Sequence, residues 1–146
     1  GLLDPKRTVQ IGIRGSTYSP DDMSFAESSG MRVIYMEEFV KLGAAKVIEI
    51  TRRVAGDGPT YVSFDVDGLD PVYAPGTGTP EIGGMTTREA QEVVRGLQGL
   101  NLVGGDVVEV SPPFGPSGNT ALVGAAFMFQ IMCLLADAVG PGRGRG

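Results

Sequence analysis

Two aspartates at the end of a predicted strand are the side chains of this sequence best suited to chemistry. Asp65 and Asp67 lie in the segment SFDVDGLDPVYAPGTGTP, residues 63–80, which begins among the β-forming side chains of residues 61–66. Side chains two positions apart in an extended segment point the same way, so both carboxylates are expected to face one place just beyond the strand. Converging carboxylates repel each other unless positive charge lies between them. The pair therefore predicts a site for a divalent cation.

A third carboxylate, Glu109, lies in VVEVSPP, within a predicted strand otherwise made of valines. One interpretation is an edge-strand glutamate that faces water. The other is a carboxylate that points into the same pocket as the aspartates, where it could bind a cationic group through both oxygens. Ligands of parallel α/β sheets bind beyond the carboxyl ends of the strands. The presence of the aspartate pair favours this second interpretation.

The run DVDGLD also permits other interpretations. An EF-hand loop needs glycine at its sixth position, whereas Gly68 is the fourth residue here and a strand precedes it, which excludes that motif. A phosphatase of the haloacid dehalogenase type would show DxDG after an apolar strand, but Leu69 and the central position of the motif count against it. A purely structural role, in which both aspartates cap a turn, stays open.

The pattern of apolar residues predicts the elements that carry these side chains. The expected strands cover residues 8–14, 31–36, 61–66 and 106–110. The expected helices cover 37–54, 86–100 and 119–139, with Asn119 or Thr120 as the cap of the last one, and a short helical turn starts at Ser24. Within 37–54, the buried face is predicted to carry Val40, Ala44, Val47 and Ile48. Strands that alternate with helices indicate an α/β domain with a largely parallel sheet. The long loop 68–85, rich in proline and glycine, is expected to form a pocket wall.

The last helix is apolar on almost every side. Residues 121–136 fall short of the roughly 20 residues that span a bilayer, and Gln130 lies in the middle, so we expect a helix buried in a soluble protein rather than a membrane contact. Cys133 has apolar neighbours and is expected to be a buried thiol. The tail GPGRGRG, residues 140–146, is expected to be flexible.

Composition limits the possible partners and chemistry. The chain has 146 residues, of which 42% are hydrophobic and 20% charged, as expected for one soluble domain. Its formal charge of −5 argues against nucleic acid as a partner and is compatible with a small cationic substrate. No signal peptide is visible, so a cytoplasmic location is expected. The absence of histidine means that any chemistry must use carboxylates or groups from outside this sequence.

The segment SFDVDGLDPVYAPGTGTPEIGG resembles the signature of the ureohydrolase family, which includes arginase, agmatinase and guanidino-acid hydrolases. Three further segments match the family: QIGIRGS at residues 10–16, DVVEVSPP at 106–113 and SGNTAL at 117–122. The residues of these segments are most similar to those of agmatinase. The resemblance covers residues 1–139 as the C-terminal part of a single ureohydrolase domain.

The resemblance implies a partial three-layer α/β/α fold with a mainly parallel sheet and a metal-dependent hydrolase. In such enzymes two manganese ions activate a bridging hydroxide, which attacks the guanidinium carbon and releases urea. By position, Asp65 and Asp67 would be metal ligands, with Asp65 bridging both ions. Glu109 would be the catalytic residue that holds the substrate guanidinium, and Thr79 would lie beside it. A homo-oligomer is also implied.

The same resemblance shows what this chain does not contain. Family members are about twice this length, and their first half supplies GGDH-type and DAHxD-type motifs, which bring the histidine and the remaining aspartate ligands. Neither motif is present. We therefore expect half a ligand set and no turnover by the 146 residues alone.

The favoured function at this point is hydrolysis of agmatine to putrescine and urea. A guanidino acid such as guanidinobutyrate is the nearest alternative, and it would need a cation at the far end of the pocket, for which Arg14 is a candidate. A non-catalytic ureohydrolase-like subunit is the alternative from a different class.

Overall fold

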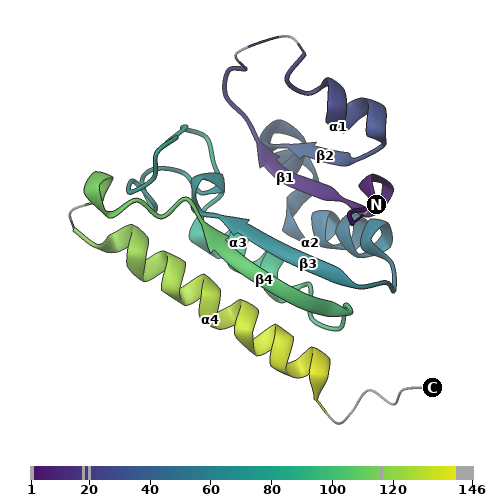
Figure 1. The fold of residues 1–146 in the computed structure, drawn as a ribbon. Helices are drawn as coiled ribbons and strands as arrows, with labels where there is room; N and C mark the ends of the chain where they lie inside the picture. The colour runs from purple at the N-terminus through teal and green to yellow at the C-terminus, as the bar shows by residue number, and fades with distance from the viewer. Residues whose placement is uncertain (1, 18, 20, 116, 141–146) are drawn as a thin grey trace.

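The structure is a computed structural model that describes residues 2–17, 19, 21–115 and 117–140. Its strands are β1 (Val9–Ile13), β2 (Arg32–Tyr35), β3 (Thr60–Asp65) and β4 (Leu102–Val108). Its α-helices are α1 (Ser24–Ser29), α2 (Met36–Ala55), α3 (Thr87–Arg95) and α4 (Asn119–Val139), and short 3-10 turns cover Pro5–Arg7, Val66–Gly68 and Pro112–Phe114. β1 pairs with β2 and β3 with β4, both in parallel (Figure 1). The predicted α/β class with parallel strands is therefore confirmed.

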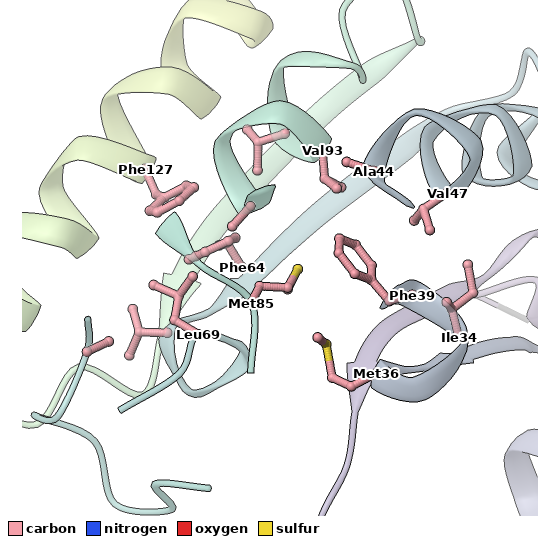
Figure 2. Close-up of a cluster of buried hydrophobic side chains, with 14 of the residues drawn as sticks. Ile34, Met36, Phe39, Ala44, Val47, Phe64, Leu69, Met85, Val93 and Phe127 are labelled. Carbon is pink, nitrogen blue, oxygen red and sulfur yellow. The ribbon is translucent and has the colours of Figure 1, made fainter. Parts of the chain in front are cut away.

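One hydrophobic core joins both strand pairs to the helices. Phe39 and Val47 of α2, Val93 of α3 and Phe127 of α4 belong to one cluster with Phe64 of β3 (Figure 2). The rings of Phe64 and Phe127 stack with their centroids 4.0 Å apart. Side chains alternate along a strand, so Phe64 points into this core while Tyr61 and Ser63 are exposed on the other face. Within the described residues, the predicted three-layer arrangement is thus present only in part.

A groove separates the two strand pairs. In the described part of the chain no ladder joins β1 to β3, and each of them is an edge strand. A space of about 830 Å³ lies between them, lined by the consecutive residues 8–13 and 59–65. Its end lies at Asp65 and Asp67, which also line it.

Helix α2 is interrupted, and one residue of its predicted buried face is exposed. Gly43 has φ 74° and ψ 159° inside it, a conformation that is not helical and that interrupts the helix. The interruption changes the direction of the preceding turn, so that Phe39 is buried and Val40 is 71% exposed. The prediction that Val40 belongs to the buried face was wrong, whereas Ala44 and Val47 are buried as predicted.

Helix α4 is less buried than its composition predicts. Phe127 and Ile131 reach the core, but Leu122, Phe129 and Met132 are exposed on the outer face. Cys133 is also exposed, so the prediction of a buried thiol was wrong. By length and hydropathy, α4 is the one helix in the described ranges that could cross a membrane. Of the predicted tail, residues 141–146 lie outside the described residues.

Candidate metal and substrate site

The carboxyl ends of β3 and β4 meet at one edge of their pair. Asp65 is the last residue of β3 and lies opposite Val108, the last residue of β4. Glu109 follows directly, so it lies just past the strand rather than inside it as the sequence pattern indicated. The register therefore brings Asp65 and Glu109 to the same edge, as expected for parallel strands.

A tight turn positions the two aspartates. Asp65 caps the 3-10 turn Val66–Gly68, and its Oδ1 accepts a hydrogen bond of 2.9 Å from the Asp67 amide. Asp67 Oδ2 accepts a second hydrogen bond, of 2.8 Å, from the hydroxyl of Thr79. The turn-capping role that the sequence left open is therefore present, and the side chains of Asp65 and Asp67 also interact directly.

The pKa of Asp65 reflects burial and neighbouring negative charge. Burial, the charge and side-chain hydrogen bond of Asp67, and the charge of Glu109 together raise this pKa from 3.8 to about 6. The hydrogen bond from the Asp67 amide acts in the opposite direction. In the described part of the chain no arginine or lysine forms an ion pair with either aspartate. A cation at this place would remove the repulsion that the three carboxylates now create.

Glu109 has an unusual backbone conformation. Its φ of 64° is the one positive φ of a non-glycine residue in the described chain. Such a conformation costs on the order of 1 kcal/mol or more and is found where the surroundings fix it, frequently at functional sites. The side chain is exposed, and a Cβ atom added to Gly78 would lie 3.9 Å from its Oε2. Glu109 therefore lies beside the loop that carries Thr79.

The long loop after β3 is held in place by hydrogen bonds rather than by secondary structure. Asp70 links the beginning of the loop to its end: its Oδ2 accepts a hydrogen bond from the Gly83 amide at 2.8 Å, and its amide donates to the Met85 carbonyl at 2.9 Å. Hydrogen bonds from the backbone amides of Val72 and Gly83 lower the pKa of Asp70. The prediction of an ordered pocket wall is consistent with this arrangement.

Two residues predicted as helix caps hold the same loop. Gly118 takes the N-cap position of α4, while Asn119 and Thr120 direct their side chains away from the helix. Asn119 Nδ2 donates to the Tyr73 carbonyl at 2.6 Å, and buried Thr120 Oγ1 accepts from the Gly76 amide at 2.7 Å. The sequence pattern of a cap residue does not distinguish these roles.

Arg14 directly follows β1, and its contacts argue against its expected role as the cation that pairs with a substrate carboxylate. Its guanidinium donates to five backbone carbonyls: Gly12 (3.3 Å), Asp67 (2.7 Å), Leu69 (3.2 Å), Glu81 (2.6 Å) and Ile82 (3.2 Å). With its donors directed at carbonyls of the chain itself, Arg14 is not a good candidate for pairing with a substrate carboxylate. Its role in the loop was not predicted.

The site therefore brings together every residue that the sequence singled out. Asp65 and Asp67 are neighbours, Thr79 is bonded to Asp67, and the charge of Glu109 acts on Asp65. Within the described ranges, however, no group of three or more aspartate, glutamate, histidine or cysteine side chains is arranged to hold a metal ion. The geometry thus brings these carboxylates to one strand edge without such a group.

Comparison with known proteins identifies the class. The sequence profile of the arginase family matches residues 1–134, so the chain belongs to the arginase family. The chain is 70% identical to the guanidinopropionase of Pseudomonas aeruginosa over 94% of its own length and 43% of that protein. It is 53% identical to the mitochondrial agmatinase of Gallus gallus, over 92% of this chain and 40% of the relative.

The fold agrees with this assignment. The solved structure of proclavaminate amidino hydrolase from Streptomyces clavuligerus matches with a TM-score of 0.89 and 40% identity, over 94% of this chain and 46% of that one. The predicted arginase-like α/β fold is thereby confirmed. The chain spans less than half the length of the relatives it matches.

Proposed function

We propose that the complete protein, of which these residues form a part, hydrolyses a guanidino compound and releases urea. The proposal is supported by the meeting of Asp65, Asp67, Thr79 and Glu109 at one strand edge, in a chain that belongs to the arginase family. Asp65 and Asp67 are proposed as manganese ligands, and Glu109 as the residue that binds the guanidinium.

The residues present suit a manganese site. Both aspartates offer hard oxygen ligands, which Mn²⁺ prefers. Burial, together with the negative charges of Asp67 and Glu109, raises the pKa of Asp65, and a divalent cation would stabilise its charged form. When bound, metal ions lower the pKa of water from 15.7 to about 7 and so supply hydroxide at neutral pH.

The remaining side chains have roles that do not depend on the metal. Glu109 can accept two N–H groups of a planar guanidinium, which fixes the orientation of the substrate. The Thr79 hydroxyl donates to Asp67 Oδ2 and so restricts the orientation of this carboxylate. Such supporting hydrogen bonds orient the ligands of a metal.

The groove suggests where the rest of the site lies. It runs between β1 and β3 and ends at Asp65 and Asp67. Both β1 and β3 have an edge without a partner strand among the described residues, and an extended segment between them could pair with both. We infer that a segment from the part of the protein not covered here lies in the groove and brings further metal ligands to its end.

For the substrate we propose a short guanidino acid. The 70% identity to guanidinopropionase supports this over agmatine, which the sequence alone had favoured. Agmatine stays the alternative because of the 53% identity to an agmatinase. Since Arg14 is bonded to backbone carbonyls, we propose that other donors bind the carboxylate of a guanidino acid.

The test is urea release by the full-length protein after manganese loading, with 3-guanidinopropionate, 4-guanidinobutyrate and agmatine offered separately. Higher kcat/KM for the acids supports the proposal, and preference for agmatine keeps the reaction but changes the substrate. No urea from any of them, under conditions in which a known ureohydrolase is active, would favour the non-catalytic subunit. The mass of the native protein, measured on the same sample, tests the predicted homo-oligomer.

A further inference from the structure

Arg14 joins the two arms of the loop that carries the proposed site. It follows β1 and reaches across to the loop between β3 and α3. On one arm it donates to the carbonyls of Asp67 and Leu69, and on the other to those of Glu81 and Ile82. Thr79, which bonds to Asp67 Oδ2, lies between these arms along the chain. One guanidinium therefore holds the backbone of Asp67 and the backbone that follows Thr79 by two and three residues.

The space around this guanidinium is closely fitted. A Cβ atom added at Gly84 would lie 2.7 Å from Arg14 Nη2, so the backbone approaches too closely for any larger residue. Several carbonyl oxygens converge on the same group, which is favourable only when charged N–H donors lie among them. Lysine presents a single point charge with three donors and cannot reproduce this planar pattern.

We propose that Arg14 is a positioning residue for the metal site, acting through the backbone of the loop and not by contact with substrate. It sets the place of Asp67 relative to Asp65 by holding the turn that follows β3. The inference rests on the proposed function for its link to manganese, but the positioning itself is a property of the chain. Loss of a group that orients a metal ligand typically lowers metal affinity about 10–100-fold.

The chain offers a matched control for the loss of an arginine bonded to carbonyls. Arg52 Nη1 donates to the carbonyls of Gly96 (2.9 Å) and Gln98 (2.7 Å), which follow α3 and lie outside the site loop. Arg52→Lys removes the same kind of interaction without touching residues 67–85. Both variants keep a positive charge, so a general change in electrostatics affects them equally.

The experiment compares Arg14→Lys with Arg52→Lys in the full-length protein. Manganese affinity is measured by the EPR signal of free Mn²⁺, and hydrogen exchange of the metal-free protein is followed in peptides from residues 67–85. We expect Arg14→Lys to raise the Kd for manganese at least about tenfold and to speed exchange in those peptides, while Arg52→Lys changes the Kd less than about twofold. KM for 3-guanidinopropionate and for agmatine at saturating manganese should change by the same factor.

Each other outcome has a defined meaning. Exchange in residues 67–85 that is unchanged in Arg14→Lys overturns the positioning role, whatever the metal does. A KM that rises for the guanidino acid alone, with unchanged manganese affinity, shows that Arg14 binds the substrate and refutes the inference. If the wild-type protein binds manganese but releases no urea, the proposed function fails while the manganese affinities of the variants still decide the role of Arg14.

Discussion

Replacing Asp65 by asparagine should make the metal-free protein more stable at neutral pH, although it removes a proposed metal ligand. The asparagine side chain has the same size and an oxygen that can accept from the Asp67 amide, but it lacks the charge that burial and two neighbouring carboxylates disfavour. The aspartate is thus expected to cost stability for the sake of metal binding, as is common at functional sites.

The sign and size of the effect follow from the pKa of Asp65. Because the folded-state pKa is raised from 3.8 to about 6, its contribution to stability is fully favourable below pH 3.8 and is lost as the pH rises through 6. The full shift corresponds to about 3 kcal/mol at pH 7.5. Asp65 is only half-buried, so solvent screening reduces this to about 1–1.5 kcal/mol. At pH 5 the gain from the substitution should be smaller than at pH 7.5, because part of the wild-type carboxyl is already protonated in the folded state.

The assay is urea denaturation of full-length wild-type and Asp65→Asn protein in EDTA at pH 7.5 and pH 5. Asp57→Asn, at an exposed turn, is the control and should change the free energy of unfolding by less than about 0.5 kcal/mol. Added manganese should stabilise the wild type and not Asp65→Asn. A metal-free Asp65→Asn protein no more stable than the wild type at pH 7.5 would refute the account of an uncompensated carboxylate.

Three other predictions concern the remaining site and its support. Glu109→Gln in the full-length enzyme should lower kcat/KM for the guanidino substrate at least about 100-fold in steady-state kinetics, while the Kd for manganese measured by EPR stays within about twofold. A loss of manganese affinity as large as the loss of kcat/KM would contradict a role in substrate binding alone. Thr79→Val removes the 2.8 Å bond to Asp67 and should raise the Kd for manganese about tenfold, whereas Thr79→Ser should preserve it. Thr120→Val leaves the buried Gly76 amide without its acceptor and should destabilise the protein by about 1–3 kcal/mol, with Thr120→Ser near wild type in the same urea titration.

The sequence predicted the site better than it predicted the surroundings of the site. Asp65 and Asp67 follow a strand, and Glu109 follows its parallel neighbour, so periodicity and the general rule for parallel sheets suffice to bring them together. Arg14 could not be placed in this way, because its partners are backbone carbonyls far along the chain, which no side-chain pattern reveals. Thr120 was assigned to a helix cap for the same reason, since a hydroxyl at a helix start can bond either to its own helix or to another loop.

Burial was the other limit of the sequence. Val40 fits the apolar stripe of a regular helix, and only the non-helical Gly43 turns it outward. The outer face of α4 is as apolar as its inner face, so composition gives no way to tell which side packs. Such errors arise where three-dimensional context overrides a local pattern.

The open groove also determines how these 146 residues would behave by themselves. In the described part of the chain, β1 and β3 present facing rows of backbone N–H and C=O groups with no ladder between them. Unprotected edges of this kind act as templates for other chains, and proteins usually cover them to prevent aggregation. A recombinant fragment with these boundaries should therefore associate with copies of itself through the groove. A segment that filled the groove, as proposed above, would cover both edges and should make this part of the molecule soluble.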